Sequence, residues 1–300
     1  MLSVGVFRRL AFLTALFAYL QIALGGVVRV TGSGLGCPDW PLCNGRPYPA
    51  ADVHSIIEYS HRTVGTITGI LLIATVVTAW LVFRRTRPVV PWLATGSLVA
   101  IAAEGALGGV VVVNELHPWL VLFHLGLAMI ILGCLLATAI MSLPASPGVP
   151  GRAVPFAAAL GAYALLLTGS AVVASEADEQ CHAWPLCGSG FALDFAGVNG
   201  FTMLHRGAVL AIGVLLVYTL VAATRRQELR MTATTTLLVL GVQVAVGAGA
   251  AVTGAALFDG LHVALATLVW AGVLAIALLT LPRADRSPAL ARLAVDKRPA

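Results

Sequence analysis

Charged residues are scarce in this 300-residue chain: Asp, Glu, Lys and Arg make up 10% of it, against about 25% in soluble proteins. Aromatic residues are also few, at 7%, whereas apolar residues reach 59% and the mean hydropathy is +0.94. This composition excludes a soluble globular protein. It also argues against nucleic-acid binding despite the net charge of +5, because the basic residues are scattered and lack interleaved aromatics. We therefore expect a membrane protein.

Eight apolar runs have the length of about 20 residues that spans a bilayer. They cover roughly 10–28, 55–83, 92–113, 120–140, 153–174, 200–223, 232–252 and 261–281. The pair Arg8-Arg9 resembles the start of a secretion signal, but no small-residue cleavage site follows it, so the first run is predicted to remain as a helix. The sequence thus predicts an all-α membrane protein with eight transmembrane helices.

The basic residues indicate the orientation of these helices. Fourteen of the eighteen Lys and Arg residues lie at the N-terminus, in alternate connections (84–91, 141–152 and 224–231) or after residue 281. The positive-inside rule then predicts a multi-pass protein of the cell membrane with both termini in the cytoplasm. The loops 29–54 and 175–199 are expected on the outer face.

An internal repeat divides the chain into two halves. The segment Cys37-Pro-Asp-Trp-Pro-Leu-Cys43 recurs as Cys181-His-Ala-Trp-Pro-Leu-Cys187, and each copy is followed eighteen residues later by a His-Arg pair. The two copies are 144 residues apart, which indicates a duplicated half-protein. We predict two pseudo-symmetric four-helix bundles, formed by residues 1–145 and 146–300.

The loop cysteines are expected to form two disulfides, Cys37 with Cys43 and Cys181 with Cys187, because the outer face is oxidising. A structural role is favoured for the second pair. For the first pair, a structural role and a redox role remain equal alternatives, since a short exposed ring exchanges readily. The fifth cysteine, Cys134, is interpreted as a small apolar residue inside a helix.

Each even-numbered predicted helix carries one histidine within its first turns: His61, His124, His205 and His262. All even helices run inward from the outer face, so the four rings are expected at similar depth. A histidine inside a bilayer is costly and suggests function, and two on facing helices of a bundle can hold a heme. The pattern predicts two sites, His61 with His124 and His205 with His262.

Heme suits these sites better than a bare metal ion, because no repeated carboxylate or thiolate completes a coordination shell at the same depth. Arg62 and Arg206 follow the first histidine of each half and are placed to pair with heme propionates. Their alternative role is interfacial snorkelling.

The halves differ in acidic residues. Glu58 lies three residues before His61, on the same helical face, whereas the second half has Thr202 there. A buried carboxylate beside a heme can exchange protons, so Glu58 is the predicted catalytic residue. The alternatives are an ion pair with Arg62 at i+4 and a favourable interaction with the helix dipole.

Other polar and charged residues are less informative. Glu104 in the third helix falls opposite Gln243, and its role is open between a polar partner and proton delivery. Arg29 has Val173 as its counterpart and is expected to serve only the N-terminal half. The remaining histidines are interpreted as solvated, with contact to a cofactor edge as the alternative for the first two: His54, His117 and His182.

These motifs together resemble heme A synthase: Glu-Tyr-x-His-Arg at residues 58–62, the Cys-x-x-Trp-Pro-Leu-Cys loop before it and a histidine on every even helix. The resemblance implies oxidation of the C8 methyl group of heme O to a formyl group by successive hydroxylations, which gives heme A for cytochrome oxidase. It implies that His61 and His124 flank the substrate heme, that His205 and His262 ligate a heme b, and that Glu58 is essential. It also implies the disulfide in the first outer loop.

The implied partners are membrane lipid and heme O, delivered by a heme O synthase, with water as the oxygen source. The electron acceptor and the formation of a homo-oligomer stay open. Two rival functions remain: a two-heme b-type cytochrome that transfers electrons, and a quinone-linked thiol oxidase that uses the loop cysteines. Histidines at one depth place two hemes side by side, which disfavours electron transfer across the bilayer, and the thiol oxidase leaves the histidines unexplained.

Overall fold

The computed structural model describes residues 3–181, 186, 187, 193 and 195–285, and eight of its helices are long and apolar enough to span a membrane. Each overlaps one of the eight predicted runs, so the prediction of eight transmembrane helices is confirmed. The helices are α1 (Val4–Val30), α2 (Val53–Phe83), α3 (Val89–Val113), α4 (Pro118–Met141), α5 (Ala153–Ala174), α6 (Asn199–Thr224), α7 (Gln227–Thr253) and α8 (Ala256–Leu279). A short 3-10 helix, η1 (Ala177–Glu179), follows α5.

Local sequence signals explain several helix ends. Ser3 caps α1 by accepting a hydrogen bond from Val6 N–H, and Asp52 caps α2 by accepting one from Ser55 N–H. Helix α4 begins at Pro118, whose missing N–H costs nothing at a first helical position. Gly254 ends α7 with a φ of 58°, in the left-handed region that glycine adopts readily.

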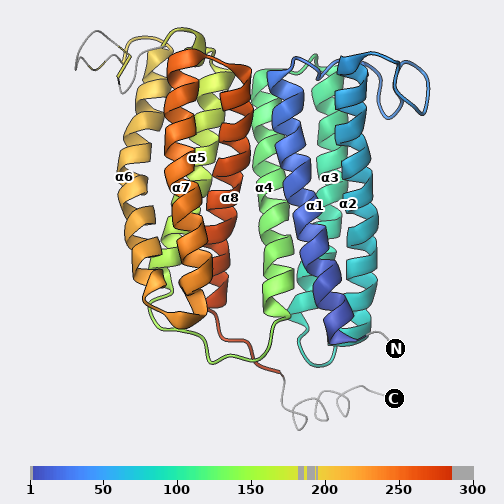
Figure 1. Cartoon of the computed structure of the whole chain (residues 1–300). Helices are drawn as coiled ribbons and strands as arrows, with labels where there is room; N and C mark the ends of the chain where they lie inside the picture. Colours follow the sequence, from blue (N-terminus) through green and yellow to red (C-terminus); the bar gives the residue numbers. More distant parts are fainter. Residues whose placement is uncertain (1–2, 182–185, 188–192, 194, 286–300) are drawn as a thin grey trace.

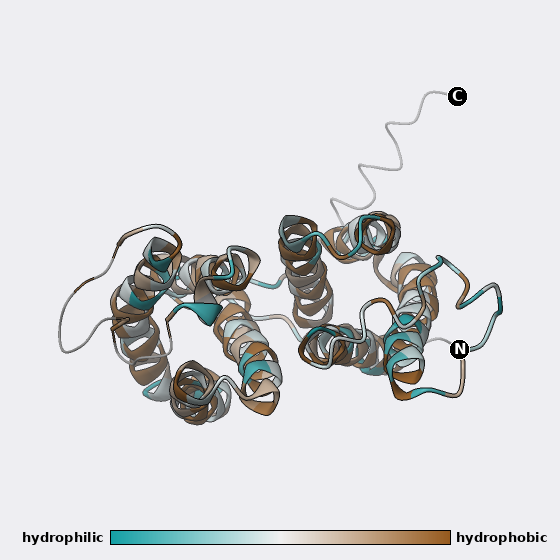
Figure 2. Cartoon of the chain, turned by 90° about the horizontal axis from the view of Figure 1, so that it is seen from above, coloured by the Kyte–Doolittle hydropathy of each residue, from teal (hydrophilic) through white to brown (hydrophobic). Residues whose placement is uncertain are grey.

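The helices form two bundles that lie side by side (Figures 1 and 2). In the first, the neighbours follow the chain in a closed ring from α1 through α2 and α3 to α4 and back to α1. The second repeats this ring with α5, α6, α7 and α8. The predicted fold of two pseudo-symmetric four-helix bundles is therefore confirmed. Within each ring the two even-numbered helices stand diagonally opposite one another.

Small residues allow the bundles to meet along α1, α4, α5 and α8. A Cβ added to Gly26 of α1 would lie 3.6 Å from Val263 of α8, and one added to Gly133 of α4 would lie 3.0 Å from the Trp270 ring. Tyr163 of α5 also donates a hydrogen bond to the Gly126 carbonyl of α4 at 3.1 Å. This close packing makes the junction part of the main hydrophobic core.

Outside the core, large apolar side chains remain exposed around both bundles, among them Val99, Leu210 and Met231. Buried threonines satisfy their hydroxyls within the helix, as Thr68 does by donating to the Val64 carbonyl at 2.7 Å. An apolar exterior with internally satisfied polar groups is what a bilayer requires. The chain is a multi-pass membrane protein.

The start of α1 and the end of α8 lie at one end of the molecule, and the segments that follow α1 and α5 lie at the other (Figure 1). At the first of these ends, Arg87 is 7% exposed and pairs with Asp285 at 2.6 Å. Arg87 also donates to the carbonyls of Met141 and Leu143, while Arg8 donates to Ser142 at 2.8 Å. Arg87 thus joins the connection between the halves to the chain segment after α8, and Arg8 joins that connection to α1.

The α7–α8 contact provides a test of this packing. An alanine at Gly272 of α8 would overlap Thr236 Oγ1 of α7 and lie 2.9 Å from Thr236 Cγ2. We expect Gly272→Ala to destabilise the protein by about 1–3 kcal/mol through overpacking, measured as a lower thermal unfolding midpoint in detergent. Gly241→Ala is the control, since no atom lies within 4 Å of its added Cβ. Equal midpoints for the two variants would contradict the packing described here.

Candidate functional site

The four predicted histidines occupy equivalent places in the structure. His61, His124, His205 and His262 each lie in roughly the first three turns of an even-numbered helix, at the end that carries the cysteine loops. All four are half-buried. His61 on α2 and His124 on α4 form the first-half pair, and His205 on α6 and His262 on α8 form the second-half pair. The diagonal positions of these helices place each pair across its own bundle.

Each histidine ring lies against a glycine of the preceding helix. A Cβ added to that glycine would come within 2.6 to 3.3 Å of the ring atom Cε1. Contacts this short leave no room for a larger residue unless the ring moves. The four contacts are Gly25 with His61, Gly108 with His124, Gly169 with His205 and Gly247 with His262.

The same preceding helix also gives each histidine a polar partner. Three histidines meet that partner through Nδ1 at 2.9 Å, whereas His61 meets the Gln21 amide through Nε2 at 3.1 Å. The three Nδ1 contacts are Glu104 with His124, Thr168 with His205 and Gln243 with His262. The Gln243 amide also lies 3.4 Å from His262 Nε2, and His124 meets Glu104 at ion-pair distance without the geometry of a hydrogen bond in the described part of the chain.

The sequence prediction did not identify Gln21, Thr168 or Gly169 as parts of these sites. A signal for Gln21 was present, because it stands four residues before the glycine that faces a histidine, as Glu104 and Gln243 also do. Residues four apart share a helical face. In α5 the residue four before Gly169 is Leu165, which is apolar. The polar partner of His205 is instead Thr168, directly before Gly169.

A heme fits the residues that the structure brings together. Each bundle provides two half-buried imidazoles on opposite helices, and the Nδ1 atom of His61 is buried without a hydrogen-bond partner within the described part of the chain. A glycine of the preceding helix lies against each of the four rings. In the described ranges, no group of three or more His, Cys, Asp and Glu side chains gathers as a metal site. Two axial imidazoles suit a porphyrin iron better than a bare ion.

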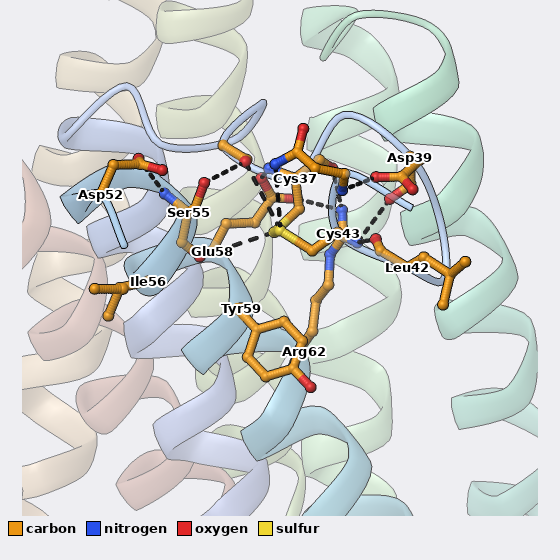
Figure 3. The surroundings of a disulfide bond; sticks show 12 residues. Cys37, Asp39, Leu42, Cys43, Asp52, Ser55, Ile56, Glu58, Tyr59 and Arg62 are labelled. Carbon is orange, nitrogen blue, oxygen red and sulfur yellow. Dashed lines mark hydrogen bonds and ion pairs between the residues drawn. A yellow bond between two sulfur atoms is a disulfide. The ribbon is translucent and has the colours of Figure 1, made fainter. Parts of the chain in front are cut away.

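Glu58 lies directly beneath the first cysteine loop (Figure 3). It is 3% exposed, and its Oε2 accepts a hydrogen bond from Cys37 N–H at 2.7 Å. Its Oε1 pairs with Arg62 on the next turn of α2, which is the ion pair considered as an alternative to catalysis. The buried carboxylate is thus joined to the loop that the Cys37–Cys43 disulfide closes.

Arg62 holds the loop to α2. Its guanidinium donates to the carbonyls of Cys37, Asp39 and Leu42 at 2.6 to 2.8 Å, in addition to pairing with Glu58 (Figure 3). Three of these four acceptors lie on the loop and one lies on α2, and an arginine has five donors with which to meet them. The predicted contact of Arg62 with a heme propionate remains a prediction, because here the side chain organises the loop.

A close backbone contact brings the loop against α2. A Cβ added to Gly36 would lie 2.5 Å from the carbonyl carbon of His54 and 2.6 Å from Ser55 N. The Ser55 hydroxyl donates to the Gly36 carbonyl at 2.6 Å. Only glycine permits this approach, and it carries the neighbouring Cys37 amide to the Glu58 carboxylate.

The second half has a different arrangement at the corresponding place. Cys181 and Cys187 form the second predicted disulfide. Thr202, the counterpart of Glu58, is 5% exposed and its hydroxyl donates to the Ala177 carbonyl at 3.5 Å. Arg206 is half-buried beside His205. The acidic contact to the loop therefore exists only in the first half, as far as the described residues go.

The structure also places the two remaining described histidines, Arg29 and Cys134. His54 is exposed and contacts Ser33 Oγ through Nδ1 at 3.0 Å, and His117 is exposed directly before α4. Both positions agree with the solvated interpretation, whereas His182 lies outside the described residues. Arg29 is exposed at the end of α1, and Cys134 is a free, half-buried thiol in α4.

Comparison with known proteins places these features in a family. A family model described as cytochrome oxidase assembly protein (COX15-CtaA) matches residues 8–56 and 49–276. A protein of Bacillus pumilus named heme A synthase is 30% identical over 69% of this chain and 71% of its own length. Heme A synthases of Shouchella clausii and Bacillus cereus are 30% and 28% identical, over 70% and 73% of this chain and 73% and 74% of their own lengths.

Loss of the Arg62 guanidinium should release the first loop. Since hydrogen bonds to charged groups contribute about 1.5–3 kcal/mol each, Arg62→Gln is expected to raise amide hydrogen exchange in residues 37–46 by about tenfold or more. Arg46→Gln is the matched control, because Arg46 is an exposed arginine of the same loop. Unchanged exchange in the Arg62 variant would show that the disulfide alone orders the loop.

The loop should also open at acid pH. Asp39 accepts hydrogen bonds from Gly45 N–H at 2.7 Å and from Asn44 N–H, and these contacts, the Gly45 one first, hold the pKa of Asp39 below its usual range. A lowered folded-state pKa stabilises the loop above the unfolded value of about 3.9. That stabilisation is lost as the pH falls through the folded value.

We expect exchange at Asn44 and Gly45, corrected for its intrinsic pH dependence, to rise below about pH 4. Asp39→Asn should exchange faster at neutral pH and show no such step. A rise in exchange of equal size in the unmodified protein and in Asp39→Asn would mean that another group is being protonated.

Proposed function

The chain belongs to the COX15-CtaA family of cytochrome oxidase assembly proteins, which it shares with heme A synthases, and we propose that it is itself a heme A synthase. In this role it is an oxidoreductase that converts heme O to heme A. We further propose that the C8 methyl group of heme O is oxidised to a formyl group by successive hydroxylations, with water as the oxygen source.

One observation carries this proposal: two matched histidine pairs are built by repeated helices, but the buried carboxylate of Glu58 that meets the outer loop beside the first pair has Thr202 as its counterpart beside the second. Glu58 stands one turn before His61, and Thr202 replaces it before His205. A protein that only transferred electrons would need no such difference. We therefore assign the substrate heme to His61 and His124, and a retained heme b to His205 and His262.

A bound heme O supplies the methyl group to be oxidised and an iron through which electrons can leave. The protein's own residues orient it. His61 and His124 would hold the heme between α2 and α4, and the glycines that face their rings, Gly25 and Gly108, fix where those rings lie. Glu58 is the proposed proton acceptor, acting at Oε1, where Arg62 now holds it as a carboxylate.

The basic connections, the start of α1 and the end of α8 occupy one end of the molecule, and the segments that follow α1 and α5 occupy the other. By the positive-inside rule we propose that the termini are cytoplasmic and that the histidine pairs lie near the outer face. The substrate would reach the site from a heme O synthase through the membrane. The electron acceptor is a separate component, and a homo-oligomer is compatible with this arrangement.

The decisive experiment is to express the full chain in cells that make heme O, extract the heme and separate it by chromatography. Heme A, or hydroxylated heme O, is the expected product. Absence of both products from a protein that carries heme b in both halves would instead support the two-heme cytochrome.

The same assay tests Glu58. Glu58→Gln keeps the size of the side chain and should retain bound heme while product falls by about 100-fold or more, the scale of lost acid–base catalysis. Glu115→Gln changes an exposed carboxylate in the α3–α4 connection and is the matched control. Turnover by Glu58→Gln equal to that of the control would remove Glu58 from the mechanism.

A further inference from the structure

Glu104 is a second carboxylate that the sequence left without a role, and it lies beside His124. Its Oε1 is 2.9 Å from His124 Nδ1, and the two side chains are 12% and 27% exposed. Neither its other oxygen, Oε2, nor His124 Nδ1 has a hydrogen-bond partner in the part of the chain that the structure describes, so the contact is one of charge at 2.9 Å. A carboxylate at this depth is costly, so its contact with a histidine points to a use.

The corresponding contact in the second half is neutral. Gln243 occupies the place of Glu104, and its amide lies 2.9 Å from His262 Nδ1. Both side chains stand four residues before the glycine that faces their histidine, Gly108 or Gly247. The two sites therefore share the 2.9 Å distance to Nδ1 and differ by a carboxylate in place of an amide, and the amide also lies 3.4 Å from His262 Nε2.

This exchange changes what the imidazole can do. An amide can turn to donate or to accept, whereas an ionised carboxylate can only accept. A carboxylate 2.9 Å from His124 Nδ1 favours a proton on that nitrogen, which would leave the lone pair on Nε2 to bind iron. A carboxylate behind a ligating histidine also raises its basicity.

We propose that Glu104 is a positioning residue that acts through His124, making it a stronger axial ligand than His262 and lowering the reduction potential of the heme held by the first-half pair. The inference rests on the proposed function for its ligand set. A stronger donor favours ferric over ferrous iron. The heme to be oxidised is then held in the electron-poor state, while the second-half heme, beside Gln243, is the easier one to reduce.

The test is a spectroelectrochemical titration of the purified full chain loaded with heme b as the probe. Two reduction waves are expected. The wave lost in His124→Ala belongs to the first-half heme and is called the first wave, and the wave lost in His262→Ala belongs to the second-half heme and is called the second wave. Glu104→Gln should raise the ferrous-to-ferric ratio of the first wave about tenfold at fixed potential, equivalent to about 59 mV for one electron. The second wave should not move.

Gln243→Glu is the reciprocal variant and should shift the second wave in the opposite direction, leaving the first in place. Glu228→Gln, at an exposed carboxylate at the start of α7, is the control and should shift neither. The reciprocal variant also decides the matter if Glu104→Gln fails to bind heme, because it adds a carboxylate to an intact site.

The outcomes separate the two proposals. If His124→Ala removes neither wave, the first-half pair does not hold heme and the ligand set of the proposed function fails. If the waves are assigned as expected but neither Glu104→Gln nor Gln243→Glu shifts its wave, the proposed function stands and the role of Glu104 is overturned.

Discussion

A histidine ring held inside a membrane protein must have both a polar partner and space, and the helix before it provides both. In all four cases a glycine faces the ring and a polar side chain meets one of its nitrogens. Because each supporting residue lies on the preceding helix, successive helices must pack as neighbours. The packing of α1 on α2, α3 on α4, α5 on α6 and α7 on α8 meets that requirement, and further contacts between these pairs close each ring.

The two halves of the chain repeat this arrangement, but they differ in their acidic residues. The first half carries Glu58 against its outer loop and Glu104 against His124, where the second half has Thr202 and Gln243. Neither exchange alters the helix packing, since each pair of residues occupies the same place in its bundle. A symmetric frame can therefore support one reactive site and one retained cofactor, which is the division that the proposed heme A synthase activity needs.

Much of this arrangement could be predicted from the sequence. Apolar runs located the eight helices, and the 144-residue repeat located the two halves and their histidines. The role of Arg62 in holding the loop was not foreseen, because its acceptors are carbonyls of Cys37, Asp39 and Leu42, and backbone groups carry no sequence signal. Whether it also meets a propionate stays a prediction. The support of His205 by Thr168 escaped prediction since it departs from the spacing of the other three partners.

The sequence by itself determined the membrane environment, the helix count and the duplication, because hydropathy and spacing along one chain are local quantities. It also singled out Glu58 and Glu104 by comparing one half with the other. Only the tertiary structure decided what each carboxylate contacts: Glu58 meets the Cys37 amide and Arg62, and Glu104 meets His124. Those contacts depend on how a loop folds onto α2 and how α3 packs on α4, which are relations between segments that no single stretch of sequence specifies.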